Sequence, residues 1–297
     1  MEACLFVGHG SRDPEGNAQL MDFTSRVGRH LSFPIVETCF LELAEPGIPE
    51  GIHRCVEKGA KRIAVVPIML LFAGHAKAHI PLAIREAARR YPAVTFAYGR
   101  PVGVDDAVLP IMERRVRSVA DLPDDRNKSD TAVLVVGRGS SDAEANSDLF
   151  KIARLLWEHL PVRWVETAFV GVTDPGWEEG VERCVRLGAK NIIILPYLLF
   201  TGVLIKRMNG RLGDLRDRYA GVHLSMTDYL GLDDGLVDVM VNRLLEAAGG
   251  RGLDWEQLAS AAEAVGHHPH HHHHDHHHHH DHHHDHHHHG PVVDRQS

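Results

Sequence analysis

The chain contains two copies of one sequence pattern, offset by 129 residues. Residues 5–10 (LFVGHG) align with residues 134–139 (LVVGRG), and the agreement continues over about 110 residues. Further matching pairs are Ser11 and Ser140, Asp13 and Asp142, Asn17 and Asn146, Glu37 and Glu166, Pro46 and Pro175, and Pro67 and Pro196. A repeat of this length is a domain-sized duplication, because solenoid units are much shorter. The chain must therefore fold as two similar units.

Each copy alternates short apolar runs with segments of helical periodicity. In the first copy the expected strands are 4–7, 35–41, 62–71 and 94–98, and the expected helices are 18–31, 49–58, 80–91 and 105–119. The apolar runs suit strands buried on both faces, joined by crossover helices. The pattern predicts an α/β fold with two tandem duplicated doubly wound domains, each a small parallel sheet flanked by helices. Ligands bind such sheets beyond the carboxyl ends of the strands.

The repeat also predicts how the chain is divided. We expect an N-terminal domain at 1–120, a polar linker at 121–130, a second domain at 131–248 and a tail at 249–297. Residues 255–265 of the tail suit a short helix. Beyond them, 19 of the 26 histidines lie between His267 and His289, interrupted by aspartates. Such a segment cannot form a core, so we expect it to be disordered and to bind additional metal ions such as cobalt, nickel or zinc.

The composition excludes several classes of partner. Hydrophobic residues make up 43% and charged residues 24% of the 297 residues, which is typical of a soluble globular protein. No apolar run reaches the roughly 18 residues of a membrane span. The net charge of −8 argues against nucleic acid, which requires a basic surface. The four cysteines form no C-x-x-C pair, so we expect reduced thiols and a cytoplasmic protein.

Three polar segments of the first copy follow expected strands: residues 8–13 (GHGSRD), 40–46 (FLELAEP) and 67–75, which end in Gly-His. The second copy provides an internal control. There His9 is replaced by Arg138, Glu42 by Gly171 and His75 by Val203, while the surrounding pattern persists. Residues that the fold requires should be present in both copies, whereas residues of a single site need only one. Two imidazoles and a carboxylate form an open site for a borderline divalent metal ion.

Three stretches of the chain resemble the CbiX-type sirohydrochlorin chelatases: GHGSRDPEGNAQ, FLELAEP and PIMLLFAGH. The similarity covers residues 1–248, and two copies followed by a histidine-rich tail resemble the long cobaltochelatase form. The resemblance implies metal ligation and catalysis by His9 and His75, with Glu42 as the active-site glutamate. Some long members carry an iron–sulfur motif near the C-terminus. This chain has no cysteine after Cys184, so we expect no such cluster and no prosthetic group.

The implied reaction inserts Co²⁺ into sirohydrochlorin with release of two protons, in anaerobic cobalamin biosynthesis. His9 and His75 would hold the ion and accept protons. Glu42 would neutralise charge, orient a histidine or relay a proton, as a ligand or from beside one. Since the substrate is a polycarboxylate, polar and basic groups should meet its rim. The candidates are Ser11, Arg12, Arg138, Lys206 and Arg207.

Two alternatives remain open from the sequence. One is insertion of iron or nickel into the same macrocycle, since related chelatases share the scaffold and ligands. The other is a metal chaperone or storage protein whose function lies in the tail, although this leaves the retention of His9, Glu42 and His75 in one copy unexplained. A nucleotide or flavin site is disfavoured, because residues 8–11 lack the third glycine of the dinucleotide fingerprint and no Walker lysine is present.

Overall fold

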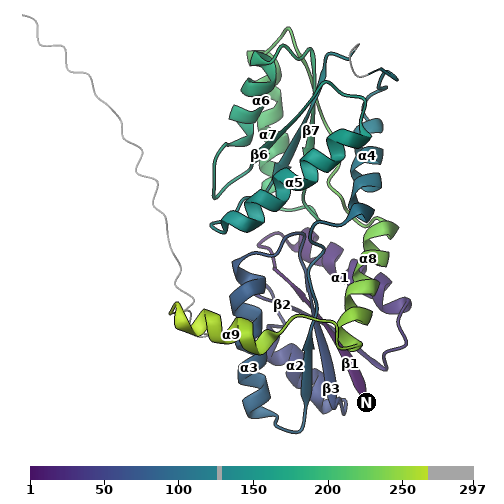
Figure 1. Cartoon of the computed structure of the whole chain (residues 1–297), viewed down its shortest axis with the longest axis vertical. Coiled ribbons are helices and arrows are strands. Elements are labelled where there is room, and N and C mark those ends of the chain that lie inside the picture. The colour runs from purple at the N-terminus through teal and green to yellow at the C-terminus, as the bar shows by residue number, and fades with distance from the viewer. Residues whose placement is uncertain (126–128, 267–297) are drawn as a thin grey trace, which may run out of the picture.

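The computed structural model describes residues 1–125 and 129–266. These residues form two lobes stacked along the long axis of the molecule (Figure 1). Each lobe contains a four-stranded sheet whose strands are all parallel, in the order β2-β1-β3-β4 in the first lobe and β6-β5-β7-β8 in the second. This confirms the predicted α/β fold with two tandem units. The histidine-rich segment from His267 onward lies outside the described residues.

The first repeat forms its helices and strands close to the predicted places. One difference is the start of α1, which begins at Pro14 rather than at residue 18. The cause is Asp13, whose side chain accepts a hydrogen bond from the Glu15 amide and caps the helix. The elements are β1 (Glu2–Gly8), α1 (Pro14–Arg29), β2 (Ile35–Phe40), α2 (Ile48–Glu57), β3 (Arg62–Ile68), the π-helix η1 (His75–His79), α3 (Ile80–Arg90), β4 (Thr95–Tyr98), the 3₁₀ turn η2 (Asp106–Val108) and α4 (Leu109–Arg117).

The second repeat reproduces the first down to the strand register. Leu5 in β1 pairs with Glu37 and Val65, and the equivalent Leu134 in β5 pairs with Glu166 and Ile194. The duplication therefore persists in three dimensions. The elements are β5 (Thr131–Gly137), α5 (Ala143–His159), β6 (Trp164–Phe169), α6 (Trp177–Arg186), β7 (Asn191–Pro196), α7 (Val203–Arg218), β8 (His223–Met226) and α8 (Asp234–Ala248).

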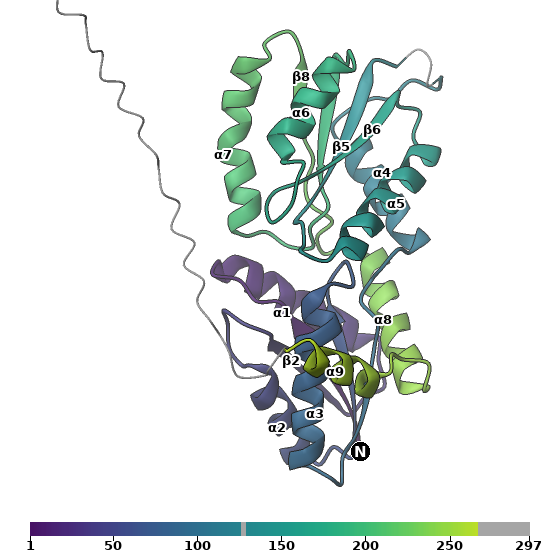
Figure 2. The same ribbon diagram turned by 60° about the vertical axis from the view of Figure 1, so that its left-hand side comes forward.

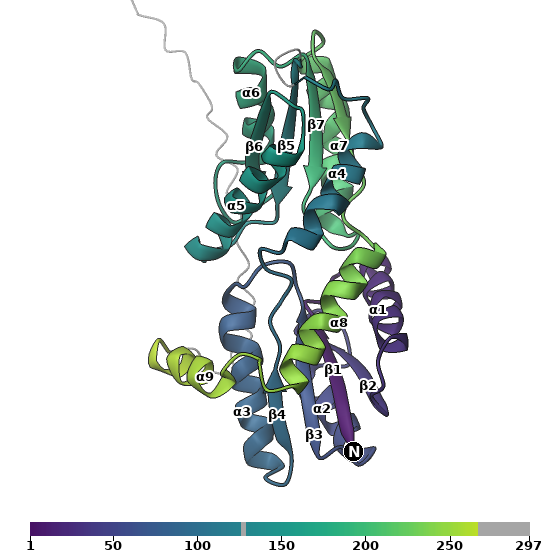
Figure 3. The same ribbon diagram turned by 45° about the vertical axis from the view of Figure 1, so that its right-hand side comes forward.

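The two repeats exchange their last helices. Helix α4, which belongs to the first repeat, packs against α5 and β7 in the second lobe, whereas α8 packs against α1 and β3 in the first lobe (Figure 3). The chain therefore crosses between the lobes twice. The buried Arg243 on α8 stabilises the segment that leads from β4 to α4. Its guanidinium donates to the carbonyls of Pro101 and Val102 and lies 2.7 Å from Asp105 Oδ2. The segments that follow β4 and β8 therefore connect the two lobes.

A further helix, α9 (Trp255–Ala264), confirms the short helix expected after the second repeat. It lies across α3 and η1 of the first lobe (Figure 2). Ala259 and Ala262 pack against Ala78 and Leu82, and Trp255 Nε1 donates to the Phe96 carbonyl at 3.3 Å. The histidine-rich segment therefore starts from a helix that is fixed beside η1. Within the described part of the chain, no helix has the length and apolarity that a membrane span requires.

Candidate metal centre

His9 and Glu42 lie on two loops whose backbones are in direct contact. His9 follows the end of β1, and the Glu42 amide donates to its carbonyl oxygen at 3.1 Å. Gly10, with φ of 89°, allows this approach, because a Cβ atom there would lie 1.8 Å from the Glu42 carbonyl oxygen. The contact between the loop after β1 and the loop after β2 therefore places both side chains at the carboxyl end of the sheet.

His75 is positioned by the π-helix η1, which the sequence did not predict. Strand β3 ends at Ile68, earlier than expected, and a loop leads to η1. The Ile80 amide donates to the His75 carbonyl, so one turn contains an extra residue. This turn brings His75 Nδ1 to 2.8 Å from His79 Nδ1. Short π-helical segments of this kind are frequent at functional sites.

The structure brings the three predicted ligands together. Among the described residues, His9, Glu42 and His75 are the group whose ligand atoms all lie within 4.8 Å of one another. His9 Nε2 is 3.6 Å from Glu42 Oε1, and the His9 and His75 rings stand perpendicular with centroids 4.9 Å apart. All three side chains are half-buried. Two imidazoles and a carboxylate can bind a borderline divalent ion and leave coordination positions open.

The surroundings keep both imidazoles neutral. Burial and then the Arg138 charge lower the pKa of His9, although Glu42 acts in the opposite direction. Burial, followed by the neighbouring His9, His79 and Arg138, lowers the pKa of His75 to about 3. A neutral imidazole carries the lone pair that a metal ion needs, so both histidines have the protonation state of a metal ligand near neutral pH.

The residues predicted to meet the substrate differ in what they contact. Arg138 Nη1 is 2.7 Å from His9 Nε2, and Lys206 Nζ is 2.6 Å from Asp13 Oδ2 and 3.1 Å from Glu15 Oε2. The Ser11 hydroxyl accepts from the Asp13 amide at 3.0 Å, a loop contact that Ser140 repeats in the second lobe. The side chains of Arg12 and Arg207 are exposed and make no hydrogen bond or ion pair to any described residue.

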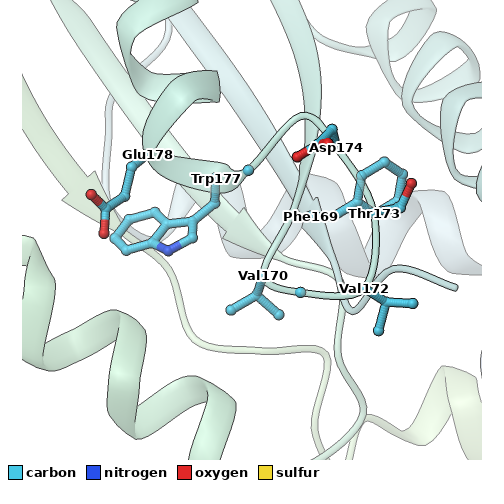
Figure 4. A pocket seen from close by; sticks show the side chains of 9 residues that line it. Phe169, Val170, Val172, Thr173, Asp174, Trp177 and Glu178 are labelled. Atoms are coloured by element: carbon cyan, nitrogen blue, oxygen red, sulfur yellow. The ribbon is translucent and has the colours of Figure 1, made fainter. Parts of the chain in front are cut away.

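The second lobe retains the loops but not the ligands. Gly171 stands at the position of Glu42, and its loop surrounds a cavity of about 390 Å³ lined by residues of the segment 169–178. Figure 4 shows Trp177 and Glu178 on one side of this cavity and Thr173 and Asp174 on the other. Val203, the counterpart of His75, is exposed. Among the described residues, this set of possible metal ligands is therefore found in the first lobe only.

Two nearby residues were not assigned a role from the sequence. His79 contacts His75, and the four-residue spacing of these two histidines was the available signal. Lys77 lies between them on η1, and its Nζ is 2.7 Å from Asp142 Oδ2 and from Glu144 Oε2 in the second lobe. Because Asp142 and Glu144 are distant in sequence, nothing in the local pattern indicated this ion pair.

Known proteins match the chain over both repeats. The sequence profile of the CbiX family matches residues 3–119 and 132–247. The chain is 48% identical over 250 residues to a sirohydrochlorin cobaltochelatase of Priestia megaterium, covering 84% of this chain and 81% of the relative. It is 36% identical over 265 residues to a sirohydrochlorin ferrochelatase of Bacillus subtilis, covering 88% of this chain and 99% of the relative.

Two solved structures agree with this grouping. SirB from Bacillus subtilis with Fe³⁺ superimposes with a TM-score of 0.73 at 35% identity, covering 84% of this chain and 97% of SirB. SirB from Bacillus subtilis subspecies spizizenii in complex with cobalt gives a TM-score of 0.70 at 35% identity, covering 84% and 96%. Since the profile matches both repeats and these relatives align over most of their length, the chain belongs to the CbiX family.

Proposed function

We propose that the chain inserts a divalent metal ion into sirohydrochlorin, with His9, Glu42 and His75 as the metal centre. The observation that carries the proposal is the meeting of these three side chains at the carboxyl ends of parallel strands, in one lobe only. Relatives over most of the chain are named sirohydrochlorin chelatases, which supports the same substrate.

The side chains divide the reaction between them. Insertion requires the ion to lose water and two pyrrole N–H groups to lose their protons. A pKa of about 3 makes His75 a poor proton acceptor near neutral pH, so we assign metal ligation to His75 and His9. Glu42 Oε1, 3.6 Å from His9 Nε2, is the carboxylate that offsets the charge of the ion and receives one pyrrole proton, while the second proton passes to solvent water.

The surroundings of the centre suit a flat macrocycle with a carboxylate rim. Leu43, next to Glu42, and Val172, its counterpart in the second lobe, are exposed apolar side chains, as is Val203. Such exposed apolar groups can cover the faces of a tetrapyrrole. Arg12 and Arg207 are available for its carboxylates, whereas Lys206 and Arg138 would first exchange their present partners.

Cobalt is the metal we propose, for use in cobalamin biosynthesis. The relative at 48% identity is named a cobaltochelatase, and imidazole-rich segments such as residues 267–289 suit borderline ions. Iron is an alternative, because relatives at 38% and 36% identity are named ferrochelatases, and nickel is another, because it suits the same imidazole ligands. Purified protein with sirohydrochlorin and equimolar Co²⁺, Fe²⁺ and Ni²⁺ should yield mainly the cobalt product. A dominant iron or nickel product would contradict this assignment.

The four cysteines are free and buried, which fits a protein of the reducing cytoplasm.

The site itself is tested by single substitutions. His9→Ala or His75→Ala should reduce the insertion rate at least about a hundredfold, because each removes a ligand of a three-residue centre. His53→Ala is the matched control, since His53 lies on α2 and contacts Tyr91 and Glu57 instead. A near-native insertion rate in the His9→Ala, His75→Ala double variant would contradict the proposal. A storage protein would instead show bound metal but no affinity for sirohydrochlorin.

A further inference from the structure

Arg138 is held in the same kind of loop as His9, on the opposite side of the interface between the lobes. It follows the end of β5 as His9 follows the end of β1. The next residue, Gly139, has φ of 87°, and a Cβ atom there would lie 2.0 Å from the Gly171 carbonyl oxygen. The duplicated loops therefore direct both side chains to the interface, where Arg138 Nη1 reaches His9 Nε2 at 2.7 Å.

This contact fixes the tautomer of His9. A guanidinium group can only donate hydrogen bonds, so His9 Nε2 accepts and carries no proton. His9 Nδ1 lies 3.2 Å from the Gly10 carbonyl oxygen, which can only accept, so the proton is on Nδ1. The two contacts agree, and the lone pair of this imidazole is on Nε2. Arg138 thus uses the electron pair with which His9 would bind a metal ion.

The guanidinium also competes with a metal ion by its charge. Glu42 Oε1 is 3.6 Å from the same Nε2 atom, and the Glu42 charge acts on Arg138. A cation at this place repels a second cation and partly neutralises the carboxylate that would attract it. The two lysines that cross the interface differ, because Lys77 and Lys206 contact carboxylates and no metal ligand.

We propose that Arg138 is a built-in competitor of the metal substrate at His9. Its guanidinium must leave Nε2 before the ion can bind there, so the second lobe sets the metal affinity of a centre whose ligands all lie in the first. The proposal rests on the metal centre proposed above and adds a determinant of affinity from the other repeat.

The test compares Co²⁺ binding to the full-length chain by titration against a competing chelator. The proteins are the unaltered chain, Arg138→Ala, His9→Ala and the double variant. Each carries the same histidine-rich segment, so the difference between a protein and its His9→Ala partner reports on the His9 site alone. Arg138→Ala should tighten the His9-dependent binding at least roughly tenfold, because a charge-assisted hydrogen bond no longer competes. The gain should vanish when His9 is alanine.

Two further variants make the result decisive. Arg138→Gln removes the charge but keeps a donor, so it should give a smaller gain in affinity, and it decides the question if Arg138→Ala fails to fold. Arg218→Ala removes an exposed charge elsewhere in the second lobe and should change nothing. Unchanged or weaker Co²⁺ binding in folded Arg138 variants, with His9-dependent binding still present, would overturn the role of Arg138 alone. If His9→Ala changes binding in neither background, the metal centre itself is wrong and the inference falls with it.

Discussion

Lys206 Nζ lies 2.6 Å from Asp13 Oδ2, so the second lobe contacts the capping residue of the first helix of the first lobe. The opposite contact also exists, because Lys77 Nζ lies 2.7 Å from Asp142 Oδ2, and Asp142 caps α5. Asp13 and Asp142 are equivalent in the two repeats. The duplication therefore produces two reciprocal ion pairs between the lobes. Both ion pairs cross the interface at which His9 and Arg138 meet.

Replacing both lysines should let the lobes separate. In a Lys77→Ala, Lys206→Ala variant we expect a longer distance between spin labels placed on the two lobes. The fold should survive, because partly exposed ion pairs contribute at most about 1 kcal/mol each. The hydrogen bond from Lys206 lowers the pKa of Asp13, so the carboxylate is ionised at neutral pH and can pair with the lysine. Lys151→Ala, on the exposed side of α5, is the control. An unchanged label distance in the double variant would show that the two lysine ion pairs do not set the arrangement, and that the crossings near Arg243 and the other contacts between the lobes, such as the one from the Thr201 amide to Gln19 Oε1, are sufficient.

His79 should act as a positioning residue for His75. Its Nδ1 atom lies 2.8 Å from His75 Nδ1, so it fixes the ring orientation and leaves His75 Nε2 for the metal. We expect His79→Ala to lower metal affinity and insertion rate about tenfold to a hundredfold, the usual cost of losing such a partner. His79→Gln should recover part of the loss, because an amide can still hydrogen-bond to the ring. If both substitutions leave Co²⁺ affinity unchanged, the contact has no positioning role.

Much of this architecture follows from the repeat. The alternation of apolar runs and helical segments predicted the two parallel sheets. The loss of His9, Glu42 and His75 from the second copy indicated which side chains meet. The exchange of α4 and α8 did not follow, because both helices have an apolar face and either sheet could accept it. The π-turn at His75 was also missed, since its sequence, HAKAH, matches an ordinary helix start. The contact of Arg138 with His9 depends on how the lobes dock, which local patterns do not encode.

The stability of the metal-free protein should fall as the pH is lowered below about 6.5. Burial, followed by the neighbouring His9, His79 and Arg138, lowers the pKa of folded His75 to about 3, whereas in the unfolded chain this histidine takes up a proton near its ordinary pKa. The unfolded state then binds more protons, so the free energy of unfolding decreases between these two pKa values. Urea unfolding at pH 7.5 and 5.5 measures the change. His75→Gln should show a smaller decrease than the unaltered chain, and an equal decrease would contradict the lowered pKa.

Deleting the residues after Val265 should impair activity at low metal concentration but not the catalytic step itself. Helix α9 ends at Ala264, and Arg85 on α3 contacts its Glu256, Ser260 and Glu263, so the truncated chain keeps this helix and the support that it gives to η1. The deleted histidines follow this helix in the sequence, and as tethered metal ligands they would raise the local metal concentration without being ligands of the centre. We therefore expect a nearly unchanged maximal insertion rate at saturating Co²⁺, but an earlier loss of activity when the ion is scarce. Full-length protein should lose this advantage near pH 6.5, the ordinary pKa of imidazole, because protonated histidines release metal ions. The measurement is insertion rate against free Co²⁺ for both chains. Loss of activity in the truncated chain at saturating metal would place the histidine-rich segment in the catalytic machinery.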